Sequence, residues 1–279
     1  MLNKFSFFSI IFLSLIFLNS NLLAEPTHIA AFNITSEEPV PTGVTFNPDG
    51  TRMYVTGINT DRIRQYTLST GFDLSSTVTL ERSRNITSLE NRPQDIAFNS
   101  DGTVIFTAGS QGDGIDSWSL STAYDINSMD PTNDHIAFTS VGGDPRDLEF
   151  NSDGTKMFIL NGSTEVKEYA LSAAYNPANP TLTNTLTISL DGGFGQGMGF
   201  SSDGKKMFLV ANTTNEIHFY NLTSGFDLSD VSYFGKYSVS TSASMNITGL
   251  AFNSDGTKMF HADFNEDEIQ EYSLPCSYG

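Results

Sequence analysis

One short peptide recurs five times along the chain and limits what the chain can fold into. Phe-Asn-Ser-Asp-Gly, or a close variant, begins at Phe46, Phe98, Phe150, Phe200 and Phe252. The steps between these phenylalanines are 52, 52, 50 and 52 residues. A period of this length is typical of a supersecondary unit that buries its apolar faces only against its neighbours. The sequence therefore predicts a repeat protein with five copies of one unit.

Each repeat is expected to contain short β-strands joined by tight turns. A short strand precedes each phenylalanine, and a second strand, such as Lys156-Met157-Phe158-Ile159, follows the Asp-Gly pair. Asp accepts hydrogen bonds from nearby amides and Gly tolerates a positive φ, so the pair predicts a hairpin turn. The alternative, a calcium-binding loop, would need an acidic ligand at the twelfth position, which every copy lacks.

A third strand lies at a fixed distance in every copy, as in 63–68, where Tyr66 and Leu68 share one face and Ile63 points to the other. Both faces are partly apolar, which a sheet stacked between neighbours requires. A more variable fourth strand is expected near 77–81, 135–141, 185–190 and 233–239.

The last repeat stops at Leu274, before any fourth strand, whereas residues 27–33 resemble the fourth-strand segment 134–139. The N-terminus is therefore expected to supply the missing strand and to close a ring, which leaves only short, protected sheet edges. An open solenoid would instead want polar caps at both ends. The fold predicted is an all-β, five-bladed β-propeller with four antiparallel strands per blade, the N-terminal strand completing the last blade.

The N-terminus has the pattern of a secretory signal peptide. Lys4 precedes an almost wholly apolar run over 5–18, and Ala24 could end a cleavage site. An uncleaved anchor is the alternative, although the run is shorter than the ~20 residues of a spanning helix. We expect 1–24 to be removed, leaving 25–279 as one secreted or periplasmic domain without a transmembrane segment. Its repeats begin near 41, 93, 145, 195 and 247.

Composition excludes several classes of partner and site. The net charge of −18 disfavours binding to nucleic acid or to anionic membranes. The single cysteine, Cys276, rules out an intrachain disulfide, so the fold must rest on its core alone. The four histidines show no ligand spacing. No metal and no cofactor is therefore expected.

The repeats resemble those of a known group of proteins. Phe-Asn-Ser-Asp-Gly-Thr-Lys-Met-Phe, at 150–158 and 252–260, is similar to the repeats of secreted bacterial β-propellers of the YVTN type and the TolB-like or WD40-like type. The resemblance covers nearly all of 27–275. The Trp-Asp and Gly-His signatures of true WD40 repeats are absent, and the repeats are longer than is usual for the YVTN type. The resemblance implies a binding platform, a periplasmic assembly part, or a lactonase or lyase.

The candidate ligand site is one mouth of the central channel, formed by the entry of each first strand and by the loops between second and third strands. Structural positions stay constant between repeats, whereas these positions vary. Arg146 with Asp95 and Asp147 would make an asymmetric polar patch for a sugar or another small polar ligand; an internal salt bridge is the alternative. The candidate ligand-binding residues are Gln94, Asp95, Asp113, Arg146, Asp147 and Gln196.

Motifs favour binding over catalysis. Neither a Gly-x-Ser-x-Gly nucleophile motif nor a phosphate-binding glycine loop occurs. The sequence therefore favours a non-catalytic exported module that binds a glycan, peptide or protein partner, with no catalytic residue assigned. The alternative is a hydrolase or lyase in the channel, glycosidase-like or lactonase-like, in which Asp95, Asp147 and Glu149 supply an acid and a base. The five repeated phenylalanines and the third-strand aromatics are expected in the core.

Overall fold

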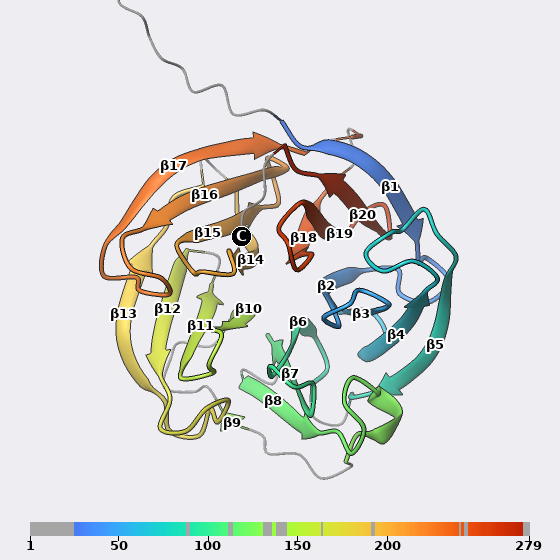
Figure 1. Ribbon diagram of the computed structural model, residues 1–279, viewed down its shortest axis with the longest axis horizontal. Helices are drawn as coiled ribbons and strands as arrows, with labels where there is room; N and C mark the ends of the chain where they lie inside the picture. The colour runs from blue at the N-terminus through green and yellow to red at the C-terminus, as the bar shows by residue number, and fades with distance from the viewer. Residues whose placement is uncertain are drawn as a thin grey trace, which may run out of the picture.

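The computed structural model describes residues 25–275, apart from 88–89, 111–113, 131–135, 138–143, 163, 191–192, 240 and 243–244. In this part of the chain, twenty strands form five four-stranded sheets, and one 3-10 helix, η1, spans Ile126–Ser128. The sheets stand as blades around a central channel (Figure 1). The predicted five-bladed β-propeller is confirmed. The signal-peptide prediction for 1–24 lies outside the described residues.

Within a blade the strands run antiparallel, outward from the channel. The first blade holds β2 (Pro41–Phe46), β3 (Arg52–Gly57), β4 (Arg62–Leu68) and β5 (Val78–Asn85). The second holds β6 (Pro93–Phe98), β7 (Val104–Gly109), β8 (Gly114–Ser119) and β9 (Ile136–Ala137). The third holds β10 (Pro145–Phe150), β11 (Lys156–Asn161), β12 (Glu165–Ala170) and β13 (Thr181–Thr187). The fourth holds β14 (Gly195–Phe200), β15 (Lys206–Ala211), β16 (Glu216–Leu222) and β17 (Val231–Ser238).

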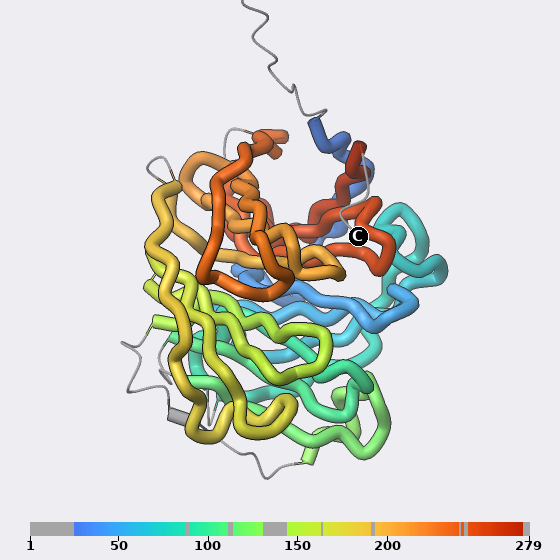
Figure 2. Tube along the Cα trace, turned by 60° about the vertical axis from the view of Figure 1, so that its left-hand side comes forward, coloured from blue at the N-terminus to red at the C-terminus, as the bar shows by residue number. Residues whose placement is uncertain are grey.

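The fifth blade is shared between the two ends of the chain. Its inner strands are β18 (Ile247–Phe252), β19 (Lys258–Asp263) and β20 (Glu268–Ser273), and its outer strand is β1 (Thr27–Asn33). Strand β1 pairs antiparallel with β20, with Ala31 opposite Gln270. Figures 1 and 2 show the N-terminal strand beside the C-terminal ones. The predicted closure of the ring is confirmed.

The fourth strands are the elements that the sequence located least well. Strand β13 starts at Thr181, where 185 was expected, because Thr181 pairs with Ala170 directly after the loop that ends at Pro180. A shift in register between Glu168 and Tyr169 then separates the two halves of this pairing.

No helix in the described part of the chain is long and apolar enough to cross a membrane.

The repeated pentapeptide makes the hairpin between the first two strands of each blade. In the first blade, the Asn47 side chain accepts a hydrogen bond from the Arg52 amide at 2.9 Å, and the Asp49 carboxylate accepts one from the Thr51 amide at 2.9 Å. Gly50 adopts a φ of 70°, in the left-handed region that glycine adopts at little cost. The Asn, Asp and Gly of the motif therefore serve to form the turn, as predicted for a hairpin.

An aromatic contact repeats between every pair of adjacent blades. The phenylalanine that ends each first strand packs against an aromatic ring on the second strand of the preceding blade, with ring centroids 4.5–4.8 Å apart. The five pairs are Phe46–Phe260, Phe98–Tyr54, Phe150–Phe106, Phe200–Phe158 and Phe252–Phe208. Each pair adds directional ring packing to the burial of a large apolar surface. The first pair joins the first repeat to the last.

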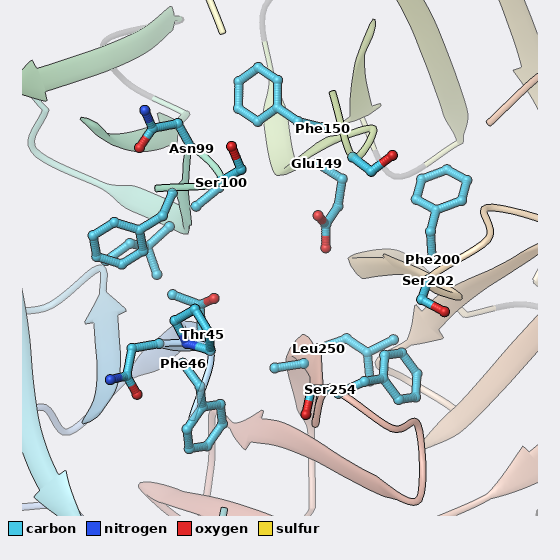
Figure 3. A pocket seen from close by; sticks show the side chains of 18 of the residues that line it. Thr45, Phe46, Asn99, Ser100, Glu149, Phe150, Phe200, Ser202, Leu250 and Ser254 are labelled. Carbon is cyan, nitrogen blue, oxygen red and sulfur yellow. The ribbon is translucent and has the colours of Figure 1, made fainter. Parts of the chain in front are cut away.

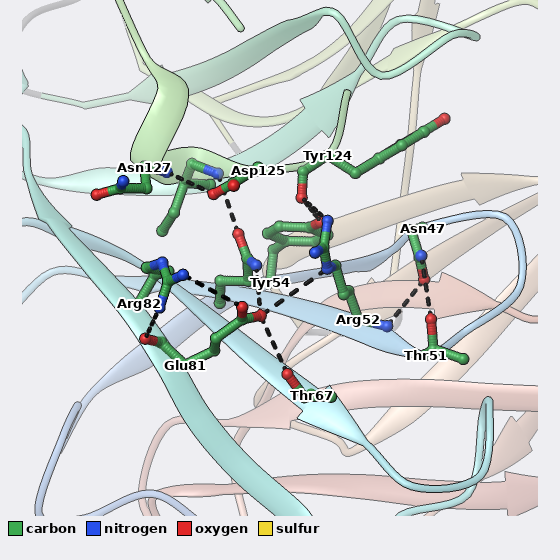
Figure 4. Close-up of polar contacts among 12 residues, drawn as sticks. Asn47, Thr51, Arg52, Tyr54, Thr67, Glu81, Arg82, Tyr124, Asp125 and Asn127 are labelled. Atoms are coloured by element: carbon green, nitrogen blue, oxygen red, sulfur yellow. Dashed lines mark hydrogen bonds and ion pairs between the residues drawn. The ribbon is translucent and has the colours of Figure 1, made fainter. Parts of the chain in front are cut away.

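Three of the interfaces share one pattern of polar contacts, in which side chains of one blade hold a loop of the next (Figure 4 shows one). The Arg52 guanidinium donates to the carbonyl oxygen of Tyr124 at 3.0 Å, and the Gln65 side chain accepts from the amide of Ile126 at 3.0 Å. Elsewhere a lysine and a glutamate take these roles. Lys156 and Glu168 hold Phe226 and Leu228, and Lys258 and Glu271 hold Phe72 and Leu74. These bonds fix the loop that follows the third strand of the next blade.

The seam between the first and last repeats offers a direct test of closure. Phe260 and Phe158 occupy the same position in different blades, and both are fully buried against two further phenylalanines. We expect Phe260→Ala and Phe158→Ala to lower the free energy of unfolding by similar amounts, about 3–5 kcal/mol each. Chemical denaturation measures both. A much smaller loss for Phe260→Ala would contradict a ring closed by this contact.

Candidate functional site

A cavity of about 500 Å³ lies at one end of the central channel (Figure 3). It sits where the first strands end and their hairpins begin, and all five blades contribute to its wall. The innermost wall includes Thr45, Asp95, Ala97, Glu149 and Ala251. Its volume falls within the range of ~300–1,000 Å³ that is typical of small-molecule sites.

Glu149 is the exceptional side chain of this cavity. Its slot on the first strand holds Thr45, Ala97, Gly199 or Ala251 in the other blades. Its carboxyl group points into the cavity in Figure 3. Burial raises the pKa of Glu149 well above its ordinary value, and the negative charge of Asp95 raises it further. Within the described chain, no hydrogen bond to this carboxyl group is formed.

Asp95 and Asp147 lie deeper and bridge neighbouring first strands. The Asp95 carboxylate accepts a hydrogen bond from the amide of Leu148 at 3.1 Å, and Asp147 accepts one from the amide of Met198 at 2.9 Å. Burial raises the pKa of Asp95 to about 7. The pKa of Asp147 is raised well above its ordinary value, by burial first and then by the charges of Asp95 and Glu149.

The surroundings of one oxygen of Asp147 also favour a protonated carboxyl group. Its Oδ1 atom is buried and accepts no hydrogen bond from the described residues. An ionised carboxylate with an unsatisfied buried oxygen would be costly, whereas a protonated carboxyl group is tolerated far better. Three acidic groups therefore meet along one side of the channel, and their burial favours the neutral form.

The other blades show why this level of the channel varies between repeats. Where the two bridging aspartates stand, the remaining first strands carry Gly43, Gly197 and Gly249. Gly249 has a φ of 31°, and a Cβ atom there would overlap the carbonyl oxygen of Thr42. Glycine is used where two first strands touch, and aspartate where a gap between them is bridged. The variation therefore has a structural cause at this level.

The remaining predicted site residues lie at the opposite end of the first strands. Gln94 donates to the Ser110 hydroxyl at 3.2 Å. Arg146 binds the Asp144 carboxylate at 2.8 Å and contacts the Gln196 side-chain oxygen at 3.5 Å. Asp113 lies outside the described residues. The structure thus brings Arg146 and Gln196 together, but Arg146 forms its ion pair with Asp144 rather than with Asp95 or Asp147.

Of the five candidates that the structure describes, Asp95 alone lines the cavity. The sequence prediction concerned the variable mouth, whereas the cavity lies at the mouth beside the constant pentapeptide, with Glu149 of the hydrolase alternative in its wall. The five phenylalanines expected in the core are half-buried, because they pack between blades and also line the cavity. The third-strand aromatics are buried as expected. One indication was present in the sequence: Glu149 is the only charged residue in a slot that is otherwise small.

Four further aromatic residues form the outer rim of the cavity. Phe72, Tyr124, Tyr175 and Phe226 adopt left-handed backbone conformations with φ of 55–59°. Each ring lies directly over the turn glycine of its own blade, where a Cβ atom would collide with it. Strained conformations of this kind persist only where the surroundings hold them. Among the described residues, no group of three or more His, Cys, Asp or Glu side chains is placed to hold a metal ion.

Comparison with known proteins identifies the fold. No protein-family model matches the sequence, and no curated protein matches it. A Bacteroides fragilis protein provisionally named as a 6-phosphogluconolactonase has a TM-score of 0.51, with 15% identity, 86% of this chain covered and 68% of that one. A functionally unknown protein from Desulfotomaculum acetoxidans has a TM-score of 0.50, with 17% identity over 85% and 69% of the two chains. The periplasmic gluconolactonase of Pseudomonas aeruginosa gives 0.49, with 15% identity over 86% and 67%.

At these identities the similarity establishes the β-propeller fold, and no family model supports the YVTN or TolB-like type. The Bacteroides fragilis protein carries the name of a lactonase, and lactonases are hydrolases. The predicted non-catalytic module for a glycan, peptide or protein is therefore wrong.

The raised pKa of Asp95 has a measurable effect on stability. An unfolded chain loses this proton near pH 3.9, whereas the folded chain keeps it to about pH 7. Between these values the folded state binds more protons, so this group's contribution to the free energy of unfolding falls as pH rises, by about 4 kcal/mol at most. Asp95→Asn keeps an acceptor for the Leu148 amide and removes the titration.

Urea unfolding of both proteins between pH 4 and pH 8 measures this effect. We expect the wild type to lose stability relative to Asp95→Asn as pH rises. A difference that is independent of pH would show that Asp95 titrates normally.

Proposed function

We propose that the chain is a hydrolase that opens a cyclic ester, a lactone, in the channel cavity, with Glu149 and Asp95 as its acid and base. One observation carries the proposal: two carboxyl groups with raised pKa face the same cavity of about 500 Å³. Titratable groups whose pKa values are displaced in a concave site are typical of catalytic residues.

The surroundings of the two groups assign their roles. The amides of Ile96 and Leu148 donate to Asp95 and favour its charged form, which limits the rise of its pKa to about 7. Glu149 has no such donor within the described chain, and burial first and then the charge of Asp95 raise its pKa well above its ordinary value. We therefore assign the ionised role, that of the base, to Asp95 and the protonated role, that of the acid, to Glu149. Two carboxyl groups held in different protonation states provide a base and an acid together.

Lactone hydrolysis needs both roles. Asp95 takes a proton from a water molecule as the water oxygen bonds to the lactone carbonyl carbon. The bond between that carbon and the ring oxygen then breaks, and Glu149 gives its proton to the ring oxygen, which becomes a hydroxyl group. One water is consumed, and the product is an open hydroxy acid. Proton transfers of this kind contribute ~10²–10⁴-fold each.

The choice of a lactone over other esters and glycosides draws on the named neighbours. The Bacteroides fragilis protein, which shares the fold at a TM-score of 0.51, is provisionally named as a lactonase. The chemistry of the site is compatible with that class, because acid–base catalysis of lactone opening needs no nucleophilic side chain. A pair of carboxyl groups also suits glycoside hydrolysis, so aryl glycosides belong in the same assay as a comparison.

We expect Glu149→Gln to lower kcat for lactone opening at least ~100-fold, because the amide cannot donate the proton that the ring oxygen needs. Continuous titration of the released acid at constant pH measures the rate above the spontaneous background. Glu165→Gln is the matched control, since Glu165 lies in the same blade but on the third strand, outside the cavity. Equal rates for Glu149→Gln and wild type, or hydrolysis of aryl glycosides in place of lactones, would contradict the proposal.

A further inference from the structure

We infer that the substrate is an uncharged, sugar-derived lactone and that the cavity excludes a phosphorylated one. This inference rests on the proposed function and adds its substrate class. Three features of the cavity support it: the lack of a lysine or arginine among its described lining residues, the hydroxyl groups on its rim and the aromatic residues of its wall.

The described residues of the wall offer no positive charge to an anionic substrate. The lining residues include Asp95 and Glu149 and, among the described residues, no lysine or arginine. The cations behind the rim are already paired: Lys156 with Glu168 at 2.8 Å, and Lys258 with Glu271 at 2.7 Å. Each of these lysines also donates to a carbonyl oxygen of the rim. A phosphate group in the cavity would thus meet carboxyl groups and no free cation, whereas phosphate sites are typically built from arginine, lysine or converging amides.

The rim presents hydroxyl groups from four blades. Ser100, Ser152, Ser202 and Ser254 occupy the same turn position, with Pro48 in the first blade, and all five line the cavity. Figure 3 shows three of these serines around the opening. Their hydroxyl groups make no hydrogen bond to the described residues. A serine hydroxyl both donates and accepts, which suits the hydroxyl groups of a sugar.

The neighbouring asparagine side chains are not available for this task. Asn99 holds the Val104 amide at 2.8 Å and the Thr103 hydroxyl at 3.2 Å, and Asn151 and Asn253 do the same in their blades. The amide groups are consumed by the hairpins. The serines are therefore the polar groups of the rim that remain free to bind a ligand.

Aromatic rings form a large part of the remaining wall. Nine of them, five from the first strands and four from the rim, line the cavity. Binding sites of this size combine aromatic surfaces with a few placed polar groups. A sugar lactone offers apolar C–H faces to the rings and hydroxyl groups to the serines. An aliphatic lactone would fill the aromatic part but leave the hydroxyl groups unmatched.

Three lactones of equal ring size separate the possibilities: a neutral sugar lactone, the same lactone carrying a phosphate, and an aliphatic lactone. We expect kcat/KM for the neutral sugar lactone to exceed both others at least ~10-fold. Thr45→Lys places a cation on the cavity wall opposite Glu149, and should lower the ratio of neutral to phosphorylated activity at least ~10-fold. Thr45→Gln reports the effect of size alone.

The outcomes distinguish the two proposals. If the wild type hydrolyses none of the three lactones, the proposed function is overturned. Turnover that favours the phosphorylated or the aliphatic lactone would overturn the inference and leave the function standing. Calorimetry of Glu149→Gln with a neutral sugar lactam, and with its phosphorylated form, tests the inference without turnover. Saturable binding of the neutral lactam alone supports it, and binding of the phosphorylated lactam or of neither would contradict it.

Discussion

The packing of one phenylalanine against the preceding blade is the interaction on which the ring depends. Each first strand ends in a phenylalanine whose side chain packs against an aromatic residue of the preceding blade, as Phe46 packs against Phe260. A blade cannot bury both faces by itself, so stability comes from these interfaces. Because the fifth interface joins the two ends of the chain, closure needs no disulfide. The same phenylalanines bring five hairpins to one end of the channel, and their outer edges become the wall of the cavity.

The constant parts of the repeat thus build the site, and a single departure from the repeat supplies its chemistry. Thr45, Ala97 and Ala251 are small residues of the cavity wall, and Glu149 projects into the space between them. Asp95 serves two purposes: it bridges two first strands through the Leu148 amide, and it lines the cavity. Asp95 is buried because it bridges two strands, and this burial also raises the pKa of its carboxyl group. The structural role and the proposed reactivity of Asp95 therefore have the same cause.

Much of the fold could be predicted from the sequence because the repeat fixes it. The spacing of Phe46 and its copies, the Asp-Gly turn and the early stop at Leu274 were enough to predict five blades and the strand shared between the ends. The fourth strands were less predictable, since β13 is set by a loop and a change in register rather than by apolar alternation. The sequence prediction of the site rested on positions that vary between repeats, whereas the cavity lies at the other end of the first strands. Arg146 and Gln94 form local contacts at the variable mouth, and Glu149 entered the sequence analysis only through the hydrolase alternative.

The account depends on the protonation of the channel carboxyl groups, and carbon-13 NMR of labelled aspartate and glutamate side chains measures it directly. Titration from pH 3 to pH 10, with signals assigned through Asp95→Asn and Glu149→Gln, follows each carboxyl group. The structure predicts that Asp95 titrates near pH 7 and that Glu149 keeps its proton well above the ordinary range. Titration of both groups below pH 5 would contradict the acid–base pair and the hydrolase built on it.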